Sequence, residues 1–170
     1  MNTWLFLGAA ALLSVERIAY ALIWRRADEF RAAWAEPVDA LRGLFYAFKA
    51  IQIGVFLSWC YVYGNGRLWP SDADALTVAI GATFIVVGQI LNASVFYRLG
   101  RHGVFYGDRF GYSIPWCTEF PFSLCSHPQY AGAVMSIWGL FLVLRFPHDD
   151  WYVLPLLETM YYFAGAHFER

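Results

Sequence analysis

The chain has 170 residues, of which 59% are hydrophobic, 20% are aromatic and only 15% are charged. A soluble domain is typically about a quarter charged, so this chain has too little polar surface to cover a globule in water. The formal net charge of -1 argues against a nucleic-acid partner. We therefore expect an integral membrane protein that has the bilayer as its solvent.

Three long apolar segments predict membrane-spanning helices, each of which needs about 20 mostly apolar residues. They cover residues 3–24, 44–63 and 76–97. The first has no basic stretch before it and is longer than the apolar core of a signal peptide, so we interpret it as a retained span.

Three further segments complete the predicted architecture. Residues 25–39 mix four carboxylates with three arginines and predict a short interfacial helix, which ends near Pro37. Residues 130–144 and 151–167 are apolar but short, and they predict a tight, partly embedded helical hairpin. The expected fold is an all-α polytopic membrane bundle of about five helices, with residues 1–170 as one domain.

Basic residues in short loops mark the cytosolic side of a membrane protein. The second and fourth loops hold one arginine each, Arg67 and Arg145, whereas the first and third loops hold seven. These seven are Arg25, Arg26, Arg31, Arg42, Arg98, Arg101 and Arg109. We therefore expect the N-terminus outside, with residues 98–129 and the chain end together on the cytosolic face.

Four charged residues fall inside the predicted spans, where a charge is costly unless it is paired or reaches the interface. Arg17 and Lys49 lie toward the cytosolic ends of their helices, from where they can snorkel. Glu16 and Glu158 are expected to face the bundle interior. They either line a head-group cavity or form structural ion pairs, and the sequence leaves both open.

Glycines recur every three or four residues between 100 and 112, interleaved with aromatic residues. Glycine lets the backbone approach a ligand closely, and aromatic rings offer faces for a flat ring or a cation. A re-entrant turn and a ligand site both fit this pattern. Farther on, Ser126 or His127 can cap a helix with Pro128 in its first turn. That helix start has free N–H groups that suit a carboxylate.

Two ordered motifs carry a family resemblance. The order Gly-x-Phe-x-Gly-Asp-x-Phe-Gly at 103–111 is followed by Phe-Pro-Phe-Ser at 120–123 and Ser-His-Pro-x-Tyr-x-Gly at 126–132. Together they resemble the phosphatidylethanolamine N-methyltransferase family, from about residue 88 to the end. Isoprenylcysteine carboxyl methyltransferases share the second motif but usually have Arg where this chain has Ser126, which favours the phospholipid branch.

The chain departs from the family pattern at two places that the family uses for its cofactor. A Gly-x-Gly on the third span is reduced here to Gly88-Gln89-Ile90, and a Glu-Glu after the last span is reduced to Glu169.

The resemblance implies that methyl groups pass from S-adenosylmethionine to the amine of phosphatidylethanolamine or its mono- and dimethyl derivatives, leading to phosphatidylcholine. The implied partners are the phospholipid and the bilayer, in a bacterial cytoplasmic membrane or the endoplasmic reticulum. A carboxyl or other small-molecule methyltransferase, or a non-catalytic protein of the same fold, is the alternative.

The resemblance and the titratable residues near the motifs give candidate site residues. The candidate proton acceptors are His127, Glu119 and Asp108. The candidate cofactor-binding residues are Gly88, His127, Pro128, Tyr130, Gly132 and Glu169. The candidate residues for the lipid head group are Tyr106, Gly107, Arg109 and Arg101. The spacing of Cys117, Cys125 and His127 fits none of the usual zinc patterns, so we expect no metal site.

Overall fold

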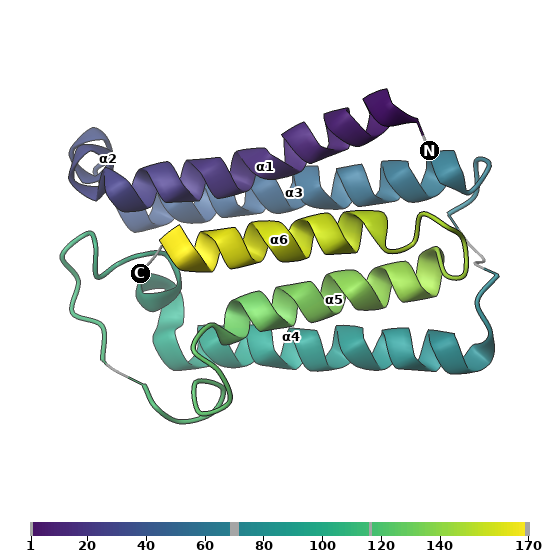
Figure 1. The fold of residues 1–170 in the computed structure, drawn as a ribbon. Helices are drawn as coiled ribbons and strands as arrows, with labels where there is room; N and C mark the ends of the chain where they lie inside the picture. The colour runs from purple at the N-terminus through teal and green to yellow at the C-terminus, as the bar shows by residue number, and fades with distance from the viewer. Residues whose placement is uncertain (1, 69–71, 116, 169–170) are drawn as a thin grey trace.

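The structure is a computed structural model that describes residues 2–68, 72–115 and 117–168. The described residues form helices joined by turns and loops, with no strand among them, which confirms the predicted all-α class. The helices are α1 (Thr3–Arg25), α2 (Ala27–Ala33), α3 (Pro37–Tyr63), α4 (Ala75–Val104), α5 (Pro128–Leu144) and α6 (Val153–Phe168). The five long helices lie side by side and alternate in direction (Figure 1).

Three of these helices, α1, α3 and α4, are long and apolar enough to cross a membrane, as predicted. Two are longer than their apolar segments: α3 begins at Pro37 rather than 44, and α4 continues to Val104 rather than ending at 97. The extension of α4 is bent at Gly100, where φ is +61°. The helix α5 is shorter and apolar, and it forms a hairpin with α6 as expected.

Local residues fix where the helices begin. The Asn2 side chain accepts a hydrogen bond from the Trp4 N–H at 3.0 Å, and Pro37 and Pro128 occupy the first turns of α3 and α5. Asp74 caps α4 by accepting from the backbone N–H of Thr77 at 2.9 Å and from its hydroxyl at 3.0 Å. These bonds hold the pKa of the Asp74 carboxyl below its usual value.

The antiparallel helices α4 and α5 pack closely through two pairs of glycines. A Cβ atom on Gly81 or Gly139 would overlap the carbonyl oxygen of the other, and the same holds for Gly88 and Gly132. Small residues let membrane helices approach at backbone distance. Two residues that the resemblance implies for the cofactor, Gly88 and Gly132, therefore lie in this helix–helix contact.

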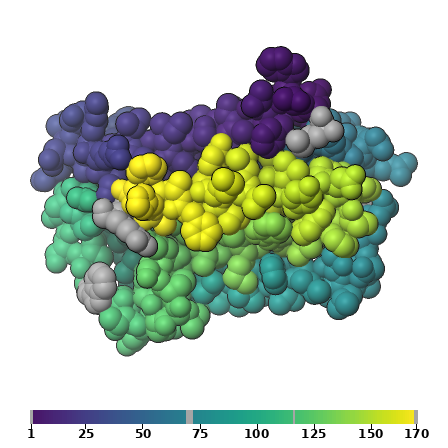
Figure 2. Space-filling view, in the orientation of Figure 1, coloured from purple at the N-terminus to yellow at the C-terminus, as the bar shows by residue number. Residues whose placement is uncertain are grey.

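The remaining helices close around α6. On the face in Figure 2, side chains of α6 fill the space between α1 and α5. The helix α1 packs on α3 and α6, and α5 packs on α4 and α6. The helices α3 and α4 meet through side chains, among them Phe45 with Phe96 and Asp39 with Arg101. Side chains of both α3 and α4 also line a cavity inside the bundle.

The two ends of the bundle differ. One end holds α2, residues 105–115 and 117–127 and the end of α6, and we call it the site end (Figure 1). At the opposite end a buried network closes the α5–α6 turn. The Asp150 carboxylate accepts from the Arg145 Nε and from the Trp59 indole, both at 2.9 Å.

Candidate functional site

A cavity of about 540 Å³ lies inside the site end. Its lining comes from α1, α3, α4, α5 and α6, together with residues 105, 106, 122, 126 and 127. Small-molecule sites commonly enclose about 300–1,000 Å³ with mostly apolar walls. The cavity is therefore large enough for a nucleoside-sized ligand.

One wall of the cavity is an aromatic stack at the start of α5. The rings of His127 and Tyr130 are stacked with centroids 5.7 Å apart and planes at 16°. Tyr130 then meets Tyr162 of α6 edge to face at 5.3 Å. Since Pro128 begins α5 directly after His127, the free N–H groups of the first helical turn lie beside this stack. The wall therefore combines flat ring faces with a positive helix end.

A tight turn after α4 places Tyr106 in the cavity lining. Tyr106 has a φ of +55°, and its ring lies 5.1 Å from that of Trp24 and 6.0 Å from that of Tyr20. The next residue, Gly107, donates to the carbonyl of His102 at 2.7 Å, and a Cβ there would overlap that carbonyl. Gly107 thus has a conformational role in presenting Tyr106.

The other sequence-predicted polar residues lie outside the cavity lining. Arg109 stacks on Trp24 with its Cζ 3.8 Å from the ring centroid, and Arg101 lies 3.5 Å from the Asp39 carboxylate. Glu119 pairs with Arg98 at 2.7 Å, and its side chain is 69% exposed. Asp108 is exposed on the turn after α4. Glu169 lies outside the described residues.

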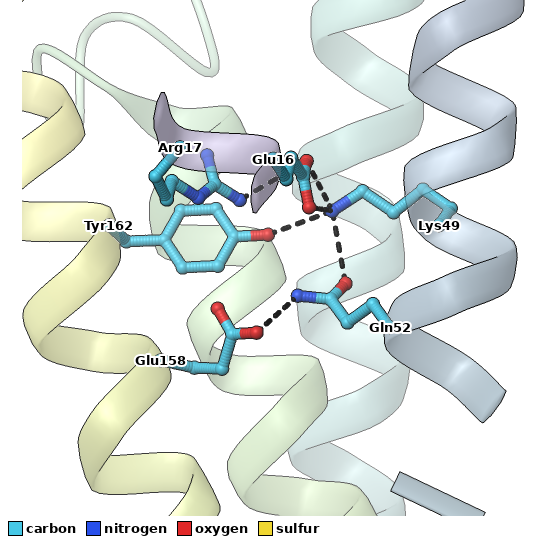
Figure 3. Close-up of polar contacts among 6 residues, drawn as sticks. All are labelled: Glu16, Arg17, Lys49, Gln52, Glu158 and Tyr162. Atoms are coloured by element: carbon cyan, nitrogen blue, oxygen red, sulfur yellow. Dashed lines mark hydrogen bonds and ion pairs between the residues drawn. The ribbon is translucent and has the colours of Figure 1, made fainter. Parts of the chain in front are cut away.

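A charged cluster forms the inner wall, deep between α1, α3 and α6 (Figure 3). The Lys49 Nζ lies 3.0 Å from the Glu16 carboxylate and donates to the Gln52 side-chain oxygen at 3.0 Å and the Tyr162 hydroxyl at 3.1 Å. The Gln52 amide in turn donates to Glu158 at 2.8 Å. The cluster joins three helices that are far apart in sequence.

This cluster shows that the suggestion of snorkelling for Arg17 and Lys49 was wrong. Arg17 and Lys49 do not snorkel: Arg17 is 9% exposed inside the bundle, and Lys49 points inward to its partners. The reason is that Glu16 and Tyr162 offer these cations partners inside the bundle. The prediction that Glu16 and Glu158 face the interior is confirmed, since both are buried.

Polar residues of α4 and α5 complete the lining. The Gln89 amide donates to the Ser136 hydroxyl at 2.9 Å, and the buried Asn92 Oδ1 has no partner among the described residues. No site role was predicted for Gln89, Asn92 or Ser136 from the sequence. Gln89 with Asn92, and Lys49 with Gln52, are polar pairs spaced three apart on otherwise apolar helices, and that spacing could have identified them.

The described part of the chain contains no candidate metal-binding site. No group of three or more His, Cys, Asp or Glu residues there is arranged to hold an ion. Cys117 and Cys125 are free thiols.

Known proteins resemble parts of the chain. At 54% identity over 50 residues, it is similar to phosphatidyl-N-methylethanolamine N-methyltransferase of Arabidopsis thaliana, covering 29% of this chain and 30% of that protein. The Saccharomyces cerevisiae protein of the same name is 36% identical over 64 residues, 37% of this chain and 31% of that one. Phosphatidylethanolamine N-methyltransferase of Mus musculus is 32% identical over 95 residues, 55% of this chain and 47% of that one.

The chain thus matches less than half the length of each of these curated relatives. No solved structure matches it. The family model described as phospholipid methyltransferase matches residues 76–170, which hold α4, α5, α6 and the site-end segment between them. That match covers more than half of the chain and confirms the resemblance found in its motifs. The chain belongs to the phospholipid methyltransferase family.

Proposed function

We propose that this protein transfers methyl groups from S-adenosylmethionine to the amine of phosphatidylethanolamine or its mono- and dimethyl derivatives, toward phosphatidylcholine. The observation that carries the proposal is the cavity at the site end. The family-matched region supplies its His127–Tyr130 stack and its Tyr106 wall. The names of the relatives include enzymes for both the unmethylated and the monomethylated lipid.

The residues present fit S-adenosylmethionine. The unpartnered Asn92 oxygen offers a buried acceptor, and the stacked rings of His127 and Tyr130 offer flat faces. The first turn of α5 offers N–H donors to a carboxylate. We propose that these groups hold the cofactor, which supplies a methyl group on a sulfonium that is already a good leaving group.

The task of the protein is then to position the acceptor nitrogen and exclude water. Aromatic and aliphatic side chains of α3 and α4, among them Phe45, Ile53 and Phe96, line the cavity on the side away from α6. Because the backbones of α3 and α4 approach each other much less closely than those of α4 and α5, we propose that the lipid reaches the cavity between α3 and α4 from the bilayer.

The acceptor amine must also lose a proton before it can attack. The imidazole is the side chain that enzymes use most often for this step, and His127 lines the cavity. We propose His127 as the proton acceptor. Since Glu119 and Asp108 lie outside the lining, they have no part in this proposal.

The protein is an integral membrane protein with apolar helices of spanning length. We propose that the site end faces the cytosol, in a bacterial cytoplasmic membrane or the endoplasmic reticulum. The arginine-rich loops support this orientation, and S-adenosylmethionine is found on that side.

The test is labelled methyl transfer by purified protein in liposomes that contain phosphatidylethanolamine or its mono- or dimethyl form. We expect label in one or more lipids of this series, and at least about a hundredfold less with His127→Ala. His148→Ala is the matched control, because that imidazole lies at the opposite end, 3.1 Å from Asp72. Label only on a prenylated cysteine would assign the isoprenylcysteine activity instead, and no label on any acceptor would refute the proposal.

A further inference from the structure

Arg17 is a buried cation with unused hydrogen-bond donors on the cavity wall. It is 9% exposed and lines the cavity, and its Nε and Nη2 have no hydrogen-bond partner among the described residues. Its Cζ lies 3.8 Å from the Tyr162 ring centroid, 5.7 Å from that of Tyr130 and 6.0 Å from that of Tyr20. Three rings therefore surround this guanidinium, as Figure 3 shows for Tyr162.

The nearby carboxylates make no hydrogen bond to these donors among the described residues. The Glu16 Oε1 forms an ion pair with the Arg17 Nη2 at 3.3 Å without hydrogen-bond geometry, and Glu16 is shared with Lys49, whose Nζ lies 3.0 Å away. Glu158 accepts from Gln52. A buried charge whose donors have no hydrogen-bond acceptor carries a desolvation cost. An acceptor bound in the cavity would offset that cost for Arg17.

A second unpartnered group lies beside the guanidinium. The Tyr20 hydroxyl is buried in the same lining and has no partner among the described residues. The start of α5, with its free N–H groups, borders the same cavity. These donors would all be satisfied by acceptor oxygens, and the planar guanidinium matches a carboxylate or phosphate with two parallel bonds.

We propose that Arg17, assisted by Tyr20, binds an oxyanion inside the cavity. The choice of oxyanion rests on the proposed function, whose two reactants each carry one: the methionine carboxylate of the cofactor and the phosphodiester of the lipid. Arg17 precedes residues 76–170, so the family match assigns it no role. The first helix thereby supplies a binding residue to a cavity built mainly by the matched helices.

The experiment measures binding rather than activity. Arg17→Gln removes the charge, and Arg17→Lys keeps it without the two-pronged geometry. The control is Arg145→Gln, a buried arginine at the opposite end that pairs with Asp150. Calorimetry in detergent compares S-adenosylhomocysteine with 5′-methylthioadenosine, which lacks the amino-acid carboxylate. Native mass spectrometry compares phosphatidylethanolamine with diacylglycerol, which lacks the phosphodiester.

If Arg17 binds the cofactor carboxylate, Arg17→Gln lowers the affinity for S-adenosylhomocysteine by at least about tenfold. The affinity for 5′-methylthioadenosine then stays nearly unchanged. If Arg17 binds the lipid phosphodiester, the Arg17→Gln variant no longer binds phosphatidylethanolamine but still binds diacylglycerol and S-adenosylhomocysteine. Arg17→Lys should show the same pattern to a smaller extent, which keeps the test decisive if Arg17→Gln does not fold.

Unchanged binding of all four ligands by folded Arg17 variants would overturn the inference. A loss of ligand binding in the Arg17 variants equal to that in Arg145→Gln would also overturn the inference, because both losses would then reflect reduced stability alone. A wild-type protein that binds S-adenosylhomocysteine but methylates no phospholipid would refute the proposed function, while the ligand comparison would still decide the role of Arg17.

Discussion

At the scale of single residues, two carboxylates near the sequence motifs are held away from the cavity. Glu119 forms an exposed ion pair with Arg98, and Asp108 is exposed on the turn after α4. An exposed ion pair contributes only about 0–1 kcal/mol. We therefore expect Glu119→Gln and Asp108→Asn to keep kcat/KM within about fivefold of wild type.

Initial rates at several lipid concentrations check this expectation. Removing a group that transfers the proton costs about 10²–10⁴ in rate. A drop of that size in either variant, with S-adenosylhomocysteine binding retained, would return that carboxylate to the catalytic site.

The sequence could supply only part of the candidate site. His127, Pro128 and Tyr130 come from one contiguous motif, so local spacing was enough to place them together. Arg17 and Lys49 come from two different helices and both pair with Glu16, and that arrangement depends on how α1, α3 and α6 pack. A charge inside an apolar segment is visible in a sequence, but its partner on another helix is not.

At the scale of helices, the α4–α5 contact depends on glycines rather than on apolar side chains. A Cβ on Gly139 would overlap the Gly81 carbonyl oxygen and lie 2.9 Å from the backbone nitrogen of Ile85. Overpacking of this kind costs about 1–3 kcal/mol. We therefore expect Gly139→Ala to lower the melting temperature in detergent by roughly 5 °C. Its matched control is Gly54→Ala, because nothing lies within 4 Å of a Cβ there.

Equal melting temperatures for the Gly139→Ala and Gly54→Ala variants would show that the close approach of α4 and α5 is not needed. Gly88→Ala extends the comparison toward the cavity. If Gly88 serves packing, this variant loses stability as Gly139→Ala does. A loss of S-adenosylhomocysteine binding at unchanged stability would instead support the cofactor role that the family resemblance implies.

Hydropathy predicted the spans but not the full helices, for a physical reason. A window of apolar residues locates the part of a helix that lies in hydrocarbon, and it stops where charge begins. The helix α3 continues back through Arg42 and Asp39, which pair with each other at 3.3 Å, and α4 continues through Arg98 and Arg101. The backbone hydrogen bonds of a helix continue past the membrane surface, whereas its run of apolar residues ends there.

At the scale of the whole molecule, the alternating helices bring distant parts of the chain to one end. The Arg25 Cζ at the end of α1 lies 5.1 Å from the ring centroid of Phe168 at the end of α6. The start of α5 is at the same end (Figure 1). The motif helix and the last helix can therefore form one site, as the order of the predicted spans required.

The orientation of this bundle in the membrane gives the last prediction. Cys125 is exposed at the site end, whereas Leu68 is 43% exposed at the opposite end. One reporter keeps Cys125 and replaces Cys60 and Cys117. The other also replaces Cys125 and carries Leu68→Cys. Because the arginine-rich loops lie at the site end, a membrane-impermeant maleimide should label Cys125 in sealed inverted bacterial vesicles and the Leu68→Cys reporter in intact spheroplasts. Labelling of Cys125 from outside would place the cavity away from the cytosolic S-adenosylmethionine pool and contradict the proposed reaction.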